Sequence, residues 1–311
     1  MADDRTTPRF IHFDGEIIPY EQARMHVLSP ALKYGVGVFE GFCGYWNDGE
    51  LFTFRMHDHL RRLRSSLDLA GLDFAGDVYA LKEQVHRLIR ANEYKQNIHM
   101  RMQIFLASDD GTPEDSGPTL MSISAVPVKE YFERPILNLG VSTWCRISDR
   151  SFPPRMKSIA NYHNGRLASI EAKRHGYDAP LMLNESGRVA EGFGYNVCFV
   201  KDGRLITPAT TESILEGITR DTILRLAREE LKVEVEERQI DRTEIHSVDE
   251  AFVCGSAAEV TTVGSIDRHM LADGQPGEVT TKLRNLYLEV ARGVSGIERG
   301  WVSTVYAPNR D

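Results

Sequence analysis

Two prolines, Pro127 and Pro135, bracket a short polar segment near the middle of this 311-residue chain. Proline fixes its own φ and has no N–H to donate, so a bracket of this kind interrupts regular structure. A chain of this length also exceeds one domain of ordinary size. We therefore predict a smaller N-terminal α/β domain at 1–127, an interdomain linker at 128–135 and a larger C-terminal domain at 136–311.

Patterns in the first half predict a mixture of strands and helices. Asp14 and Gly15 separate two short apolar runs, which is typical of a β-hairpin with a type I′ turn. Strict alternation of apolar and polar residues at 98–104 predicts a strand with His99, Arg101 and Gln103 on one face. Apolar spacing and turn residues further predict helices at 56–71 and 76–93, an acidic loop at 108–118 and a strand at 120–126.

The second half predicts a similar mixture. Asp202 and Gly203 again favour a hairpin turn, here between two apolar runs. Thr219 is expected to cap a helix, because the first helical amides need a side-chain acceptor. The expected elements are strands at 137–144 and 250–254, helices at 161–175 and 217–231, and a hairpin at 195–207.

Composition excludes several classes of protein. A formal net charge of -8 argues against nucleic acid as a partner, since binding to phosphates needs an excess of clustered cations. No apolar run approaches the length of a membrane span, so no membrane partner is expected. The four cysteines are far apart without C-x-x-C spacing, which argues against a metal site and favours a reducing, cytoplasmic location.

Four features could carry chemistry. Lys157 lies among small and apolar residues, where desolvation would favour the neutral amine that attacks an aldehyde. Glu191 precedes a glycine-rich turn and could hold a proton on a pyridine nitrogen. Gly217 precedes a helix whose first amides suit a phosphate, and the turn at 255–258 offers further amides and a hydroxyl. Each feature alone also fits a surface lysine or an ordinary turn.

In their order along the chain, these features resemble the class IV aminotransferases, the group of branched-chain aminotransferase and D-amino-acid transaminase. The resemblance covers almost the whole chain and is densest at 34–41, 157–162, 174–177, 191–196, 217–221 and 255–259. It implies the two-domain α+β or α/β architecture of fold type IV, with pyridoxal 5'-phosphate as cofactor and the reactive lysine in the C-terminal domain. It also implies a homodimer or an assembly of dimers, because a neighbouring subunit completes the site in this family.

The resemblance also assigns cofactor roles. Lys157 would form the Schiff base and act in catalysis, Glu191 would bind the pyridine nitrogen, and Tyr162 would hydrogen-bond the ring hydroxyl. The phosphate would be bound by Arg62, Ile218, Thr219 and Ser256. The family often has threonine where Ser256 stands, and either hydroxyl can donate to a phosphate.

Substrate positions agree with the branched-chain enzymes only in part. Tyr34, Phe39, Gly41 and Arg101 match them, and Arg101 would reach the distal carboxylate of glutamate. His99, Ala257 and Ala258 are further pocket candidates. The family commonly has arginine in place of Cys43, tyrosine in place of His99 and an acid in place of Tyr195.

These residues predict a transaminase that moves an amino group between a branched-chain or other hydrophobic amino acid and 2-oxoglutarate by a ping-pong mechanism. The aromatic residue before Asn196 resembles the (R)-selective amine transaminases, so the alternative is an (R)-selective amine or D-amino-acid transaminase that uses pyruvate or another oxo acid. An aminodeoxychorismate lyase and a cofactor-free binding protein are further alternatives. Arg101 and the 39–41 motif favour the transferase over the lyase.

Overall fold

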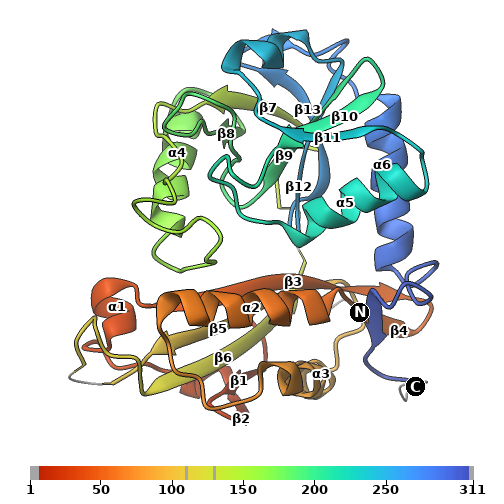
Figure 1. The fold of residues 1–311 in the computed structure, drawn as a ribbon. Coiled ribbons are helices and arrows are strands. Elements are labelled where there is room, and N and C mark those ends of the chain that lie inside the picture. The colour runs from red at the N-terminus through yellow and green to blue at the C-terminus, as the bar shows by residue number, and fades with distance from the viewer. Residues whose placement is uncertain (1–6, 109–110, 129–130, 308–311) are drawn as a thin grey trace. The chain divides into compact units, whose positions relative to one another are not determined.

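The computed structural model describes residues 7–108, 111–128 and 131–307 (Figure 1). These residues form two compact units. Unit 1 comprises the described residues of Met1–Lys129, Met156–Ala160 and Glu289–Asp311, and unit 2 those of Glu130–Arg155 and Asn161–Leu288. Residues 109–110 of the predicted acidic loop and 129–130 of the predicted linker lie outside the described residues.

Unit 1 is built on a seven-stranded antiparallel sheet in the order β15-β4-β3-β5-β6-β1-β2. Its strands are β1 (Phe10–Phe13), β2 (Glu16–Pro19), β3 (Gly37–Asn47), β4 (Glu50–Phe54), β5 (Ile98–Leu106), β6 (Thr119–Pro127) and β15 (Val302–Thr304). Its helices are α1 (Pro30–Tyr34), α2 (Met56–Ala70), α3 (Leu81–Asn92) and the 3-10 turns η1 (Tyr20–Gln22) and η2 (Val78–Ala80).

Local residue choices explain the predicted elements of unit 1. Asp14 and Gly15 both adopt positive φ, 46° and 91°, which confirms the type I′ hairpin between β1 and β2. Helix α2 buries Leu63 and Leu67, and burial of such a side chain contributes roughly 1.5–3 kcal/mol. The helix ends where Gly71 takes the left-handed conformation with φ of 64°, as predicted.

Unit 2 contains an eight-stranded mixed sheet. The main order is β11-β10-β9-β12-β13-β7-β8, with β14 paired to β13. Its strands are β7 (Ile136–Val141), β8 (Ala179–Leu181), β9 (Asn196–Lys201), β10 (Arg204–Pro208), β11 (Val235–Arg238), β12 (Glu250–Gly255), β13 (Glu259–Ile266) and β14 (His269–Met270). Helices α4 (Tyr162–Arg174), α5 (Ile218–Glu229) and η3 (Arg242–Ser247) accompany it, and α6 (Glu278–Ala291) follows β14 in the chain.

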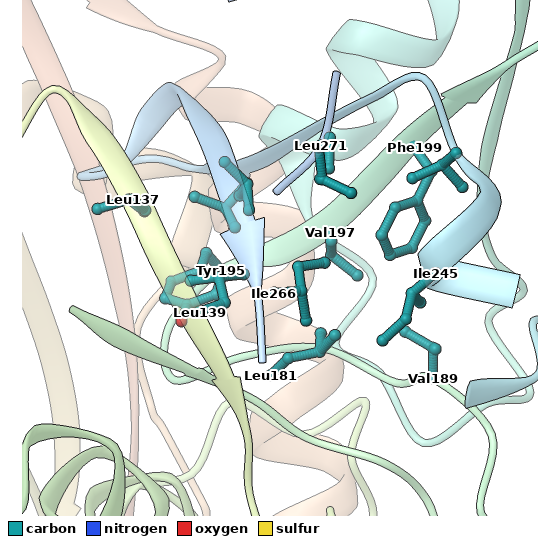
Figure 2. Packing of buried hydrophobic residues seen from close by; sticks show 14 of the residues in the cluster. Leu137, Leu139, Leu181, Val189, Tyr195, Val197, Phe199, Ile245, Ile266 and Leu271 are labelled. Atoms are coloured by element: carbon teal, nitrogen blue, oxygen red, sulfur yellow. The ribbon is translucent and has the colours of Figure 1, made fainter. Parts of the chain in front are cut away.

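One apolar cluster in the core of unit 2 packs around this sheet (Figure 2). Leu139 of β7 and Val197 of β9 are both fully buried in it. Tyr195 also belongs to the cluster, and its hydroxyl donates to the Pro180 carbonyl at 2.6 Å. Because that polar atom is satisfied, the tyrosine can stay buried at little cost.

Three element boundaries differ from the prediction. The prediction that Thr219 caps α5 is wrong: Gly217 is the N-cap, with extended ψ of 131°, and Thr219 is a buried residue of the first turn. Strand β7 ends at Val141, before the predicted end at residue 144. The predicted helix at 76–93 begins as η2 and becomes α-helical only at Leu81.

The predicted domains at 1–127 and 136–311 stay a prediction, but the compact units group two segments differently. The residues around Lys157 cluster with unit 1, because their backbone hydrogen-bonds to β3. The C-terminal residues also cluster with unit 1, since β15 pairs with β4. Among the described residues, no helix combines the length and apolar character needed to span a membrane.

Candidate active site

The backbone around Lys157 is fixed against the first residues of β3. Phe39 N donates to the Lys157 carbonyl at 2.9 Å, and Ile159 N donates to the Gly37 carbonyl at 3.0 Å. Lys157 N donates to Ser66 Oγ of α2 at 3.1 Å. Strand β4 pairs only with the far end of β3, so this stretch of β3 has an edge available for the segment. The partly buried lysine side chain therefore starts from a well-defined point in unit 1.

Four predicted substrate residues lie on one face of the sheet in unit 1. Gly41 of β3 pairs with Arg101 of β5, and Phe39 and His99 occupy the same face because side chains alternate along a strand. The Arg101 guanidinium carbon lies 3.9 Å from the centre of the Phe39 ring, and Lys157 Nζ lies 4.9 Å from it. Two cationic groups are thus gathered around one aromatic ring.

His99 is held as a neutral group on this face. Burial, followed by the nearby charges of Arg101 and Lys157, lowers its pKa to about 4. A Cβ atom at residue 41 would lie 3.2 Å from His99 Nε2, so glycine at that position leaves room for the imidazole. The ring can exchange hydrogen bonds with a substrate without adding a third charge.

Arg62 is held on α2 instead of on the Phe39 face. Its Nε and Nη2 each donate to a carboxylate oxygen of Glu40 at 2.7 Å, and His59 Nδ1 lies 2.7 Å from the same group. Although burial alone would raise the pKa of Glu40, the charge and hydrogen bonds of Arg62, with those of His59, lower it to about 2. The ion pair fixes the orientation of the guanidinium. Tyr34, on α1, is 52% exposed and does not belong to either group.

In unit 2, the carboxylate of Glu191 is buried and accepts hydrogen bonds from Arg146, Asn196 and Leu215. Arg146 Nε donates to Oε1 at 2.7 Å, while Asn196 Nδ2 and Leu215 N donate to Oε2 at 2.9 and 3.0 Å. Only 4% of the residue is exposed. These donors fix the direction of the carboxylate and favour its role as a hydrogen-bond acceptor.

Two further predicted cofactor residues border the same turn. The ring of Tyr162, the first residue of α4, packs edge-on against Phe193 with 5.3 Å between ring centres. A Cβ at Gly194 would lie 3.9 Å from the Tyr162 hydroxyl, and a Cβ at Gly255 would lie 3.0 Å from the Gly194 carbonyl. The turn that carries Ser256 therefore packs on the Glu191 loop.

The start of α5 lies against the same loop. A Cβ at Gly217 would lie 2.0 Å from Asn196 Oδ1, so the two segments are in direct contact. The N-cap residue of this twelve-residue helix, Gly217, has no side chain to cap it, and the amides of Ile218 and Thr219 lie at a helix start that suits an anion.

Ala257 and Ala258 follow Ser256 in the turn between β12 and β13. Ala258 is buried, and its carbonyl accepts a hydrogen bond from Thr261 Oγ1 at 2.7 Å. Their place in this turn puts both alanines near the Glu191 loop.

Sequence reasoning missed four residues at these sites. Glu40 and Asn196 lay inside recognised motifs, but no role was predicted for them. For Glu40 a signal existed, because an acid within an apolar strand indicates a buried partner. Tyr131 lay in the predicted linker, yet its hydroxyl donates to the Phe193 carbonyl at 3.3 Å, and burial raises its pKa to about 12. Arg146 had no local signal, because only the fold brings it to Glu191.

Comparisons with known proteins agree with this geometry. The family model described as amino-transferase class IV matches residues 37–266. The branched-chain-amino-acid aminotransferase of Escherichia coli is 35% identical over 303 residues, which cover 95% of this chain and 97% of that protein.

Two solved structures share the fold. The branched-chain aminotransferase of Thermoproteus uzoniensis with norvaline has a TM-score of 0.92 and 35% identity, with 96% of this chain and 100% of that chain covered. The branched-chain amino acid aminotransferase of Thermobaculum terrenum in its PLP form has a TM-score of 0.90 and 41% identity, with 97% and 100% covered. These matches confirm the predicted fold type IV architecture. The chain therefore belongs to the class IV amino-transferases, a family of enzymes that transfer amino groups.

Proposed function

We propose that this enzyme uses pyridoxal 5'-phosphate to move an amino group between a branched-chain or other hydrophobic amino acid and 2-oxoglutarate. The observation that carries the proposal is the arrangement around Glu191 in unit 2. A buried carboxylate, the phenol of Tyr162 and the uncapped start of α5 all border one turn. The Escherichia coli relative is named for branched-chain amino acids, and the Thermobaculum terrenum structure is titled as a PLP form.

The chemistry of the side chains fits this cofactor. In unit 1, Lys157 offers an amine for an aldehyde and Arg62 a fixed cation for a phosphate. In unit 2, Glu191 offers an acceptor for a protonated ring nitrogen, and Ser256 and the start of α5 suit phosphate oxygens. When bound, pyridoxal phosphate supplies an aldehyde that takes up the amino group and a ring that withdraws electrons.

Each of these residues has a separate proposed role toward the cofactor. Lys157 would hold the cofactor through Nζ, and the same amine would move a proton at the substrate carbon. Tyr162 would donate to the ring hydroxyl oxygen, and Glu191 would accept a hydrogen bond from the protonated ring nitrogen. Arg62, whose guanidinium is oriented by Glu40, would bind the phosphate.

The face around Phe39 supports the proposed substrates. Arg101 Nε donates to Gln103 Oε1 at 3.1 Å, and Gln103 Nε2 donates to Ser122 Oγ at 3.2 Å, so the guanidinium is anchored along the sheet. An anchored guanidinium beside Phe39 suits the distal carboxylate of 2-oxoglutarate, and the ring itself suits an aliphatic side chain. The Thermoproteus uzoniensis structure was determined with norvaline, an aliphatic amino acid.

An (R)-selective amine or D-amino-acid transaminase is the second candidate. His99 favours this second candidate, because the branched-chain enzymes commonly have a tyrosine where this chain has a neutral histidine. Tyr195 does not favour it, since that side chain is buried in the core with its hydroxyl on Pro180.

We also propose a homodimer or an assembly of dimers. Exposed apolar side chains gather in one stretch that leads through α1, and such patches commonly form interfaces. They are Met25, Val27, Leu28, Leu32 and Tyr34. A cytoplasmic location is proposed from the cysteine usage. Sedimentation of the holoenzyme measures the assembly, and a monomer at micromolar concentration would contradict a dimer.

A donor and acceptor panel tests the activity. The holoenzyme is incubated with leucine and 2-oxoglutarate, with D-alanine and 2-oxoglutarate, and with (R)-1-phenylethylamine and pyruvate, and the new amino acid is measured. We expect leucine with 2-oxoglutarate to be fastest. The variant Lys157→Ala should keep the wild-type circular dichroism spectrum and lose turnover in every reaction. Turnover in that variant would contradict the catalytic role of Lys157. A preference for (R)-1-phenylethylamine would favour the second candidate.

A further inference from the structure

Arg146 is a buried arginine that links three parts of unit 2. Only 8% of the residue is exposed. Its Nε donates to Glu191 Oε1 at 2.7 Å, and its Nη1 donates to Asn161 Oδ1 at 2.7 Å. Its backbone N donates to the Leu183 carbonyl at 2.7 Å, so hydrogen bonds fix both its main chain and its side chain.

One arm of this side chain reaches the start of α4. Asn161 directly precedes Tyr162, the first residue of that helix. Asn164, in the first turn, lies 3.4 Å from Nη1 through its Oδ1 and returns a hydrogen bond from Nδ2 to the Cys145 carbonyl at 3.0 Å. Arg146 therefore connects the carboxylate of Glu191 to the helix turn that carries Tyr162.

The opposite side of Glu191 is tied to the segment before α5. Asn196 Nδ2 lies 2.9 Å from Glu191 Oε2 and 3.0 Å from the Leu215 carbonyl. Leu215 N donates to the same carboxylate oxygen at 3.0 Å. Glu191 is thus the centre of one network that runs from α4 to α5, and Arg146 is the cation within it.

We propose that Arg146 is a positioning residue that keeps Glu191 ionised as a hydrogen-bond acceptor toward the cofactor's ring nitrogen and fixes the helix turn that carries Tyr162 relative to Glu191. A buried carboxylate without a cation partner tends to take up a proton, and it would then donate to the ring nitrogen instead of accepting from it. Arginine suits this role because it stays charged when buried and its planar head reaches two acceptors at once. This inference rests on the proposed role of Glu191.

The test is a double-mutant cycle of Arg146→Met and Glu191→Gln. Arg146→Met alone should weaken cofactor binding by about 10- to 100-fold, measured by titrating apoenzyme with pyridoxal phosphate. It should also shift the pH at which the absorbance of the bound cofactor changes, which a purely structural arginine would not do. In the Glu191→Gln background the same substitution should no longer shift the pH profile and should weaken cofactor binding only about as much as Asn161→Ala does, because the charged partner is already lost and only the arm to α4 remains.

Three further variants sharpen the result. Arg146→Lys keeps the charge and should restore the pH profile in part, and it serves if Arg146→Met fails to fold. Asn161→Ala removes the shorter of the two contacts from Arg146 to α4 and leaves Glu191 with its cation, so it should weaken binding without moving the pH profile. Arg55→Met is the matched control: Arg55 is buried in unit 1, its Nε lies 2.7 Å from Asp58, and its effect should add fully to that of Glu191→Gln.

The outcomes separate this inference from the proposed function. If Glu191→Gln binds cofactor and turns over like wild type, the proposed role of Glu191 fails, and the inference fails with it. If Glu191→Gln is impaired but Arg146→Met has no effect, or has its full effect in both backgrounds, only the inference is overturned. Non-additive effects of the two substitutions, together with a shifted absorbance profile in Arg146→Met, support it.

Discussion

Arg62 contacts Glu40 with two nitrogen atoms, Nε and Nη2, each 2.7 Å from a different carboxylate oxygen. The pair joins α2 to β3, and Glu40 is completely buried. The cation proposed to bind a phosphate is therefore oriented by an acid that no ligand would touch. Such a pair adds specificity of direction more than net stability, because both groups give up water to form it.

Glu40→Gln should destabilise unit 1 by about 3–5 kcal/mol, since it leaves Arg62 without its counter-charge. Urea unfolding of the apoenzyme measures this change. The exposed pair of Arg9 and Glu93 provides the control, and Glu93→Gln should cost less than about 1 kcal/mol. The Glu40 variant should also bind cofactor more weakly, and wild-type affinity would mean that Arg62 needs no help from Glu40.

Acid should weaken the fold in two successive ranges. Burial lowers the pKa of His86 to about 4, so this histidine takes up a proton more readily in the unfolded chain, where the ordinary value is 6.5. The contribution of neutral His86 to the free energy of unfolding is complete above pH 6.5 and is lost as pH falls toward 4. The pKa of Glu40 is lowered to about 2, so its contribution is present above pH 4.5 and is lost as pH falls from there toward 2.

Unfolding free energies at pH 7.5, 5.5 and 4.5 check the first range. Between pH 7.5 and 4.5 the unfolding free energy of His86→Gln should fall by about 1–3 kcal/mol less than that of wild type, because glutamine does not titrate. His57→Gln is the control, since His57 is an exposed histidine on α2. Equal pH slopes in wild type and the His86 variant would contradict the assignment.

Gly41→Ala should disturb the substrate face while the fold survives. The added Cβ would lie 3.2 Å from His99 Nε2, so the imidazole must move by a few tenths of an ångström. We expect a higher KM with little change in cofactor affinity, measured by initial rates and cofactor titration. His99→Ala in the same chain removes the clash and should recover part of the loss, whereas an unrelieved loss would point to the strand backbone.

Arg101→Ala should discriminate between acceptors. If its guanidinium holds the distal carboxylate of 2-oxoglutarate, kcat/KM should fall more for that acceptor than for an aliphatic oxo acid. Expressed as transition-state free energy, the difference between the two losses should be about 1–3 kcal/mol. Arg101→Lys is the matched control, because it keeps the charge and loses the two-pronged contact. Parallel losses for both acceptors would indicate a structural arginine and would favour the amine transaminase alternative.

Local chemistry in the sequence was enough for much of the framework. Asp14 and Gly15 determine their hairpin because few other residues accept positive φ at both positions. The alternation at 98–104 predicted β5 and the shared face of His99 and Arg101, since strand geometry has a period of two. The predicted family and cofactor rest on motifs whose order, more than any single residue, is distinctive.

The tertiary structure decided the features that depend on distant parts of the chain. Thr219 has the chemistry of an N-cap, yet the N-cap is Gly217, which packs so closely on Asn196 that a side chain there would clash. Lys157 groups with β3 because β4 is too short to cover that edge of the strand. Arg146 lies 45 residues from Glu191 in sequence, and no local pattern encodes a 2.7 Å contact over that separation. Burial and pairing of charges are properties of the packed chain, so only the folded structure could place them.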